Sequence, residues 1–199
     1  MVIYYFCNKK LYTMNTINRR EYLETAYRMF GLKDDEGGVN RTQGLFMMCE
    51  DIMKDNFVVA EIGSYAGVSS EVLSLHCEKI YCIDTWEDWN NDGIIFQAME
   101  LFDNMTSFYP HVNKMHMRGD DASKMFPDEY FDLVYIDASH WYEDVINDIN
   151  TWLPKIKKGG YLSGHDYLEN IDVLYAVNDY FGKTHSITRY PDSSWVIKK

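Results

Sequence analysis

The sequence predicts an α/β fold, namely a Rossmann-like doubly wound sheet of seven strands that is mostly parallel. From Phe57 onward, short apolar runs rich in β-branched residues alternate with helical patterns, which is typical of a parallel sheet covered by helices on both faces. The end of the chain predicts two more strands around a Pro-Asp turn, and these add an antiparallel C-terminal hairpin. No internal repeat or linker interrupts the 199 residues. We therefore predict one domain over 1–199, with an N-terminal arm and helical cap over 1–56 and a sheet core over 57–199.

Each element follows from a local pattern. Two helices are expected before the first strand, at about 16–30 and 41–54, because apolar residues recur there every three or four positions. The parallel strands are expected at FVVAEI (57–62), KIYCID (79–84), NKMHMRG (113–119), FDLVYID (131–137) and GGYLSGHD (159–166). The helices between and after them are expected at about 68–77, 94–108, 122–126, 142–156 and 170–181. The hairpin strands are expected at HSITRY (185–190) and WVIKK (195–199). The clearest amphipathic stripe is formed by Tyr142, Val145, Ile146, Ile149, Trp152, Leu153 and Ile156.

Charge and cysteine usage narrow the function classes. The formal net charge of −12 argues against nucleic acid or an anionic membrane surface as a partner, because both are bound through a basic face. Cys49, Cys77 and Cys82 lie in or beside apolar segments and match no metal-binding spacing, which predicts buried thiols and a cytoplasmic location. We expect no signal peptide, because the apolar start lacks a basic region and a cleavage site. No run approaches the roughly 18 apolar residues of a membrane span.

The polar residues that follow the strands define the expected binding site. Ligands of an open α/β sheet bind beyond the carboxyl ends of its strands. The five ends here read EIGSYAG, IDTW, RGDDA, IDASH and SGHDY, and each places polar or acidic residues directly after an apolar run. Because these ends meet at one edge of the sheet, the sequence predicts an acidic, polar cleft.

The first two strand ends suggest the ligand. Gly63 and Gly67 allow a sharp turn and close backbone approach, and the helix that follows offers free N–H groups to a carboxylate or phosphate. Glu61 suits a ligand with an ammonium group, and Asp84 can accept hydrogen bonds from both hydroxyls of a ribose. A plain tight turn for the first segment, and a helix cap or solvated acid for Asp84, are the alternatives. The compound that combines an ammonium, a carboxylate and a ribose is S-adenosyl-L-methionine.

These residues resemble class I S-adenosylmethionine-dependent methyltransferases, in the small O-methyltransferase group related to the catechol and macrocin enzymes (the methyltransferase domain 24 type). The resemblance covers about 57–197 and is carried by EIGSYAGVSS, CIDTW and DLVYIDASHWYEDVINDINTWLPKIKKGGYLSGHDY. It implies that Asp84, with Thr85 beside it, binds the ribose and that Asp121 and Ala122 flank the adenine. Asp137 borders the cofactor as well. The residues implied around the methionine part are Glu61, Gly63, Tyr65, Gly67 and Ser69.

The resemblance also implies where the reaction occurs. In metal-dependent members the acid after the fourth strand binds a divalent cation together with two polar residues after the fifth, which here are Asp137, His165 and Asp166. A histidine suits manganese, iron or zinc better than magnesium, so the presence and identity of a metal stay open, and a hydrogen-bonded polar cluster is the alternative. His140 stands where the catechol-type enzymes place their base, with a packed residue of the following helix as the alternative. The candidate catalytic residues are His140, Asp137 and His165.

The sequence says less about the acceptor, the molecule that would receive the methyl group. The helices before Phe57 and the loop TWEDWNNDG are expected to grip it, with Trp86 and Trp89 either stacking on it or packing the loop against the sheet. We expect O-methylation of a small-molecule or sugar hydroxyl, and a homodimer stays open. A catalytically inactive, methyltransferase-like binding protein is the alternative. A nicotinamide oxidoreductase is disfavoured, because the first turn reads E-x-G-x-x-x-G rather than G-x-G-x-x-G.

Overall fold

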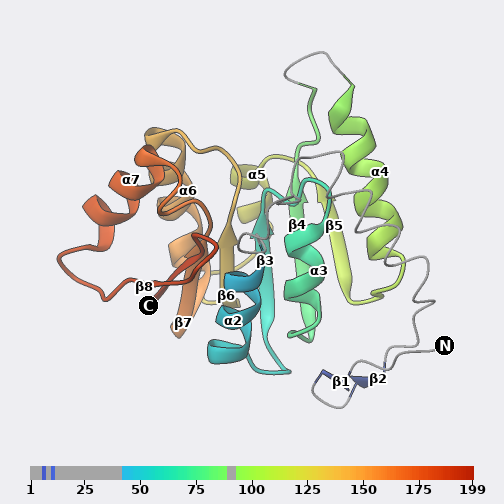
Figure 1. Ribbon diagram of the computed structural model, residues 1–199, viewed down its shortest axis with the longest axis horizontal. Coiled ribbons are helices and arrows are strands. Elements are labelled where there is room, and N and C mark those ends of the chain that lie inside the picture. The colour runs from blue at the N-terminus through green and yellow to red at the C-terminus, as the bar shows by residue number, and fades with distance from the viewer. Residues whose placement is uncertain (1–5, 8–9, 12–41, 89–92) are drawn as a thin grey trace.

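The computed structural model describes residues 6–7, 10–11, 42–88 and 93–199. It contains a seven-stranded sheet in the order β5-β4-β3-β6-β7-β9-β8 (Figure 1). The strands are β3 (Val58–Ile62), β4 (Lys79–Asp84), β5 (Val112–His116), β6 (Phe131–Ile136), β7 (Ile156–Gly164), β8 (Thr188–Arg189) and β9 (Trp195–Lys198). The first five are mutually parallel, and β9 pairs antiparallel with both β7 and β8. The predicted fold class and its C-terminal hairpin are therefore confirmed.

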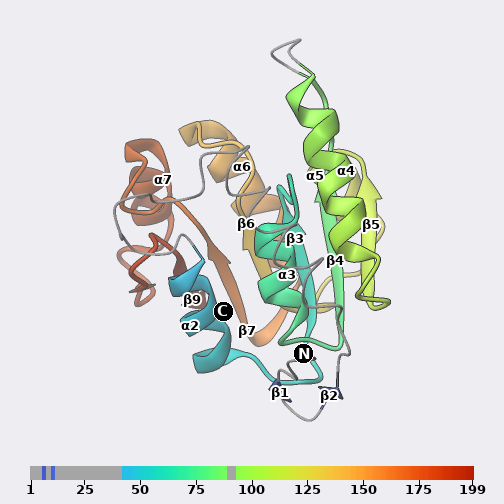
Figure 2. The same cartoon turned by 45° about the vertical axis from the view of Figure 1, so that its right-hand side comes forward.

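The helices divide between the two faces of the sheet. They are α2 (Gln43–Ile52), α3 (Val68–Ser74), α4 (Ile94–Thr106), α5 (Gly119–Ser123), α6 (Tyr142–Trp152) and α7 (Ile171–Phe181), with a 3₁₀ turn η1 at Leu153–Lys155. One apolar core contains Leu45, Leu73 and Phe102 from α2, α3 and α4. The other contains Ala122 and Trp152 from α5 and α6, together with residues of α7. Figures 1 and 2 show the two groups of helices on opposite sides of the sheet.

Among the boundaries that differ from the expectation, two helix boundaries have a clear local cause. The helix expected from Ala122 begins at Gly119, because Asp120 and Asp121 occupy its first turn, where acidic groups favour the helix dipole. The helix expected to reach Ile156 ends at Trp152. Pro154, which has no N–H for the helical ladder, lies in η1, and Ile156 opens β7.

Outside the main sheet, β1 (Phe6–Cys7) pairs with β2 (Lys10–Leu11) as a separate two-stranded sheet. The helix expected at 16–30 and the side chain of Trp89 lie outside the described residues, and the helix expected at 41–54 is α2. Cys49, Cys77 and Cys82 are buried free thiols, as predicted. Within the described part of the chain, no helix has both the length and the apolar character needed to cross a bilayer.

The strand order places the site. Connections run outward in both directions from the central pair β3 and β6, so the crevice between the loops that follow these two strands is the switch point at which open α/β sheets bind ligands. Glu61 and Ile62 at the end of β3 lie opposite Tyr135 and Ile136 at the end of β6. The polar segments that the sequence places after these strands therefore meet at this crevice.

Candidate active site

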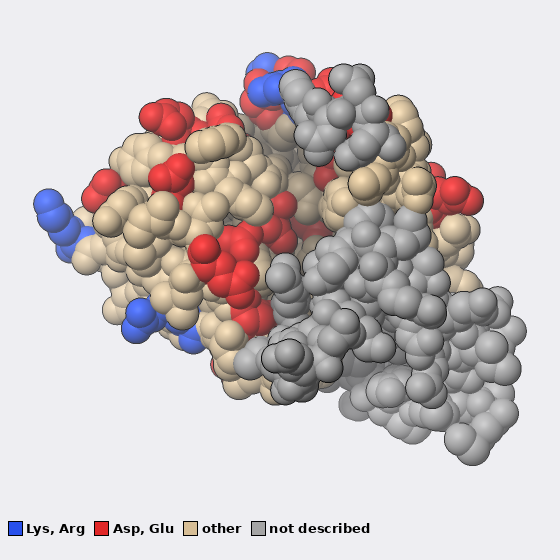
Figure 3. Space-filling view, turned by 45° about the horizontal axis from the view of Figure 1, so that its top comes forward, with Lys and Arg blue, Asp and Glu red and all other residues tan. Residues whose placement is uncertain are grey.

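A cleft of about 930 Å³ opens at this edge of the sheet, a volume typical of small-molecule sites. Figure 3 looks onto this edge and shows acidic side chains gathered around a hollow. Segments after β3, β4, β5, β6 and β7 line the cleft, as do the start of α2 and one face of α6. The described charged residues in its wall are Asp84, Glu87, Arg118, Asp137, His140, Asp144, Asp148, His165 and Asp166. The structure thus brings the five predicted strand ends to one acidic cleft.

The turn after β3 brings two segments into direct contact. Gly63 has φ +91°, and a Cβ on it would lie 2.0 Å from the carbonyl oxygen of Asp137, so only glycine fits. Gly67 then begins α3 in a left-handed conformation. Gly63, Tyr65 and Ser69 line the cleft, whereas Gly67, which was expected beside them, is not among the lining residues.

Glu61 lies beneath this turn rather than in the cleft wall. Its side chain is fully buried, and it accepts hydrogen bonds from the hydroxyls of Ser69, at 2.6 Å, and Ser70. Burial raises the pKa of Glu61, although the serine hydroxyls oppose the shift. The carboxyl group expected to meet an ammonium instead holds α3 against the end of β3.

Asp84 ends β4 in the cleft, and two backbone amides hold its carboxylate. One oxygen accepts from the N–H of Tyr65 at 2.9 Å and the other from the N–H of Trp86 at 2.7 Å. Each carboxylate oxygen has a further lone pair, so the group can still accept from two ligand hydroxyls. This geometry fits the expected ribose contact, and Thr85 lines the cleft beside it.

The segment after β5 presents other residues than expected. The exposed carboxylate of Asp121 pairs with Lys124 at 2.7 Å, and Ala122 is buried in the core. Neither lines the cleft. Met117, Arg118 and Gly119 do so instead, because α5 begins three residues earlier than the pattern indicated.

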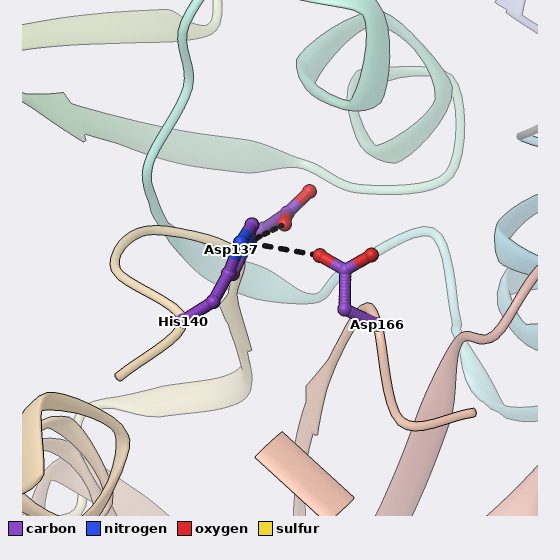
Figure 4. A group of neighbouring side chains, drawn as sticks. All are labelled: Asp137, His140 and Asp166. Atoms are coloured by element: carbon purple, nitrogen blue, oxygen red, sulfur yellow. Dashed lines mark ion pairs between the residues drawn. The ribbon is translucent and has the colours of Figure 1, made fainter. Parts of the chain in front are cut away.

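A charged cluster occupies the ends of β6 and β7. The Nε2 atom of His140 lies 2.9 Å from a carboxylate oxygen of Asp166 and 3.7 Å from one of Asp137. Figure 4 shows the imidazole pointing between the two carboxylates. The Nδ1 atom of His165 lies 3.2 Å from the other oxygen of Asp166. The structure therefore joins all four residues that the sequence assigned to the reaction.

Mutual charge sets the protonation of this cluster. Asp137 and Asp166 raise the pKa of His140 to about 10. Burial lowers the pKa of His165, but the hydrogen bond with Asp166 and the charge of Asp137 outweigh it and raise that pKa to about 9. Burial opposes ionisation of Asp166, yet the two histidines hold its pKa well below its usual range. These shifts favour the imidazolium forms of His140 and His165 and the carboxylate form of Asp166 at neutral pH.

The same geometry tests the expected metal set. Asp137, His140 and Asp166 offer ligand atoms that all lie within 4.8 Å of one another. His140 thus takes the place expected for His165, whose Nδ1 faces Asp166 from the other side. Two carboxylates and one imidazole fit manganese, iron or zinc better than magnesium. The two carboxylates can stabilise either a proton on His140 or, together with the neutral imidazole, a divalent cation.

The part of the cleft that was expected to meet an acceptor is lined partly by residues that the motifs did not single out. Trp86 is buried, packs against Phe102, and donates from its indole N–H to the carbonyl of Tyr65 at 2.8 Å, so it packs its loop as in the alternative interpretation. By contrast, Trp141 lines the cleft beside His140 and is 71% exposed. Leu45 and Thr42 bring the start of α2 to the same cleft.

One wall of the cleft was missed altogether. Asp144, Asn147 and Asp148 of α6 line it. The available signal was their spacing, because residues three and four apart share a helix face, and three polar residues at such positions mark a second polar stripe beside the apolar one.

The sheet order, the glycine turn after β3 and the carboxylate at the end of β4 agree with the class I S-adenosylmethionine-dependent methyltransferases that the sequence resembles. A family model described as a methyltransferase domain matches residues 60–167. This is more than half of the chain, and the chain belongs to that family.

The chain is similar to a curated protein in sequence and to solved structures in fold. A curated relative, an uncharacterised protein of Acanthamoeba polyphaga mimivirus, is 30% identical over 139 residues, which span 63% of this chain and 59% of the relative. A Streptococcus mutans protein assigned as a methyltransferase and solved with SAH has a TM-score of 0.60 at 11% identity, covering 78% of this chain and 96% of its own. The O-methyltransferase NovP has a TM-score of 0.56 at 14% identity, covering 86% and 79%.

Proposed function

We propose that this chain binds S-adenosylmethionine in the cleft and directs its methyl group to a hydroxyl of a small molecule or sugar. The observation that carries the proposal is that one cleft joins Asp84, with its free lone pairs, to the charged cluster of Asp137, His140 and Asp166. A ribose-binding acid and a proton-accepting cluster in one cavity are what hydroxyl methylation requires.

Each group has a separate task in this proposal. The bound cofactor would supply an electrophilic methyl group. Asp84 holds the ribose, and the turn at Gly63 keeps the backbone low enough for a ligand to lie across the switch point. His140 first releases to solvent the proton that Asp137 and Asp166 stabilise on it, and its neutral imidazole then accepts the hydroxyl proton. Those three residues would hold a divalent cation if one binds, and a bound cation would lower the pKa of an acceptor hydroxyl.

Separating binding from turnover tests the assignment. We expect Asp84→Ala to weaken binding of S-adenosylhomocysteine about tenfold or more, since two hydrogen bonds to a charged acceptor are lost. We expect His140→Ala to keep that dissociation constant within about threefold but to lower turnover about a hundredfold or more. Calorimetry measures the first, and transfer of a labelled methyl group to a panel of hydroxylated acceptors measures the second.

Controls make the outcome specific. His185→Ala changes an exposed histidine outside the cleft and is expected to behave as the wild type in both assays. Thermal unfolding of each variant checks that Asp84→Ala retains the fold after losing its two backbone partners. An unchanged affinity in Asp84→Ala would refute the ribose contact. Turnover insensitive to a chelator would refute the cation, and transfer to no hydroxyl despite tight cofactor binding would favour a binding protein.

A further inference from the structure

The turn of the C-terminal hairpin, residues 190–194 between β8 and β9, is packed into the protein. Its residues Asp192, Ser193 and Ser194 are at most 3% exposed, although connecting segments usually lie at the surface. Buried polar groups are nearly always hydrogen-bonded, so the partners of these residues indicate what the turn does. No step of the proposed function accounts for it.

Asp192 fixes the turn to the start of α2. One carboxylate oxygen accepts from the N–H of Ser194 at 3.0 Å, and the other accepts from the N–H of Leu45 at 2.7 Å. A Cβ on Gly44 would lie 2.0 Å from the same carboxylate, so the helix can approach this closely because Gly44 has no side chain. Leu45 lines the cleft. The turn is therefore anchored to the wall of the cleft that α2 forms.

Ser193 joins this turn to the segment after β7. Its carbonyl oxygen accepts from the N–H of Tyr167 at 3.1 Å, and its hydroxyl oxygen accepts from the N–H of Leu168 at 2.8 Å. Both amides belong to the two residues that directly follow Asp166. One buried serine thus binds the backbone on the C-terminal side of a carboxylate in the charged cluster.

Trp195 holds the other side of Asp166. Its indole N–H donates to the carbonyl oxygen of His165 at 3.2 Å. Gly164 pairs with Trp195 in the sheet, and a Cβ on Gly164 would lie 2.9 Å from the indole nitrogen, so the glycine leaves room for the ring at the strand end. The hairpin therefore binds the chain immediately before and immediately after Asp166.

The backbone of Asp166 is in a conformation that needs such support. Its φ is +60°, in the left-handed region that residues other than glycine seldom adopt. Ser193, at φ +72°, is left-handed as well. Strained conformations persist where the surrounding structure fixes them, and they cluster at active sites. With its backbone held in this way, Asp166 places a carboxylate oxygen 2.9 Å from Nε2 of His140.

We propose that Ser193 is a positioning residue for the reaction, which fixes the backbone after Asp166 and so holds the Asp166 carboxylate against His140. The inference rests on the proposed function, in which His140 accepts the proton, and it gives the C-terminal hairpin a role at the site. Ser193 is not among the residues that line the cleft, so it acts through the backbone of its neighbours. Its loss should impair turnover and leave cofactor binding at the ends of β3 and β4 unchanged.

Turnover and cofactor affinity together separate this role from a general effect on the fold. Ser193→Ala removes the hydroxyl acceptor, and we expect kcat for methyl transfer to a hydroxylated acceptor of the panel to fall about tenfold, because misplacing a catalytic group slows the reaction. The dissociation constant of S-adenosylhomocysteine, measured by calorimetry on the full chain, is expected to stay within about twofold.

Ser194→Ala is the matched control. This serine is buried in the same turn, but its hydroxyl finds no partner among the residues that the structure describes. It is therefore expected to match the wild type in both kcat and affinity, and thermal unfolding of both variants checks that each retains the fold.

A spectroscopic signature makes the test independent of the acceptor. NMR of the full chain with carbon-13-labelled histidine records the imidazole resonances at neutral pH, and the His140 peak is identified by its loss in His140→Gln. In Ser193→Ala this peak is expected to move by more than its linewidth, because the carboxylate beside it has moved. The peak of His111, which lies outside the cleft wall, is expected to stay in place. In Ser194→Ala neither peak should move.

Each outcome supports or overturns the inference. An unmoved His140 peak in folded Ser193→Ala, or an equal displacement in Ser194→Ala, would overturn it. A loss of S-adenosylhomocysteine affinity as large as the loss of kcat would overturn it too, since the effect would then reach both sides of the cleft. Ser193→Gly also lacks the hydroxyl and adopts positive φ without strain, so it replaces the alanine variant if that one does not fold. A wild type that methylates no acceptor counts against the proposed function, and the NMR comparison then decides the inference by itself.

Discussion

The two sides of the cleft hold their carboxylates in opposite ways. At the ends of β3 and β4, Glu61 accepts from serine hydroxyls and Asp84 from backbone amides, so every partner is neutral. At the ends of β6 and β7, Asp137 and Asp166 face histidines that can gain or lose a proton. The first side therefore holds its acids through neutral donors, whereas the second side depends on the charge of its histidines.

This difference matches the tasks that we propose for the two sides. Neutral donors fixed by the backbone place a negative group without supplying a proton or a competing charge, which suits a contact that must stay constant through a reaction. Ionisable partners set close together shift each other's pKa values, as groups that transfer protons require. Three changes test the contrast, beginning with the residue at which the two sides touch.

The largest effect is expected at Gly63, where the turn after β3 meets the segment after β6. In Gly63→Ala the new Cβ would lie 2.0 Å from the carbonyl oxygen of Asp137, and φ is +91°. Both the clash and the backbone strain act against the fold, so we expect the free energy of unfolding to fall by about 3 kcal/mol or more. Urea unfolding measures the loss, and calorimetry with S-adenosylhomocysteine should show no binding.

Gly159→Ala is the matched control, because Gly159 also has positive φ, +78°, but no atom lies within 4 Å of its Cβ position. Backbone strain alone is expected to lower the free energy of unfolding by about 1 kcal/mol. The difference between the two variants isolates the contact between the two sides. Equal losses would mean that the sides do not press on each other at Gly63.

The contrast also explains how far the sequence could predict this site. The edge of the sheet was predictable, because apolar runs bounded by polar residues mark the strand ends and parallel strands align those ends. That Gly119 rather than Asp121 lines the cleft was not predictable, since it depends on where α5 begins. Successive helix residues point about 100° apart, so a start three residues earlier turns Asp121 toward solvent and leaves Gly119 at the cleft.

The burial of Glu61 could not be predicted from the sequence either. Glu61 ends an apolar strand, as a ligand-binding acid would, and its removal from the cleft depends on Ser69 and Ser70 of α3 folding back over it. The cluster around His140 was found because all of its members directly follow strands. Asp148 was not singled out. Its spacing from Asp144 and Asn147 marks a polar face of α6, but the direction in which that face points depends on how α6 packs in the fold.

The next largest effect is expected in how the free energy of unfolding depends on pH through the histidines at the ends of β6 and β7. The folded-state pKa of His140, about 10, lies above its ordinary value of 6.5. Its contribution to stability is therefore complete below about pH 6.5 and is lost as the pH rises toward 10. His140→Gln should lower the free energy of unfolding by about 1 kcal/mol at pH 6, since the imidazole is half-exposed and solvent screens it.

Urea unfolding at a series of pH values measures this effect, and the gap between His140→Gln and the wild type should close by about pH 10. His165, whose pKa is about 9, should lose its contribution earlier in the same series. His185→Gln, a change at an exposed histidine outside the cleft, is expected to follow the wild type throughout. A gap that is constant with pH would mean that His140 acts through packing rather than charge.

The smallest effect is expected at Ser69, which lines the cleft but donates its hydroxyl hydrogen bond to Glu61 at 2.6 Å. Because Ser70 still donates to the same carboxyl group, Ser69→Ala should lower the free energy of unfolding by only about 0.5 to 1 kcal/mol. Its affinity for S-adenosylhomocysteine should change by less than about threefold, since the hydroxyl acts on the buried acid rather than on a ligand. Calorimetry and urea unfolding on one preparation compare the two quantities. A tenfold loss of affinity at unchanged stability would instead place Ser69 in contact with the methionine part of the cofactor, as the family resemblance implies. The side formed by β3 and β4 would then both hold its own acids and donate a hydroxyl hydrogen bond to the ligand.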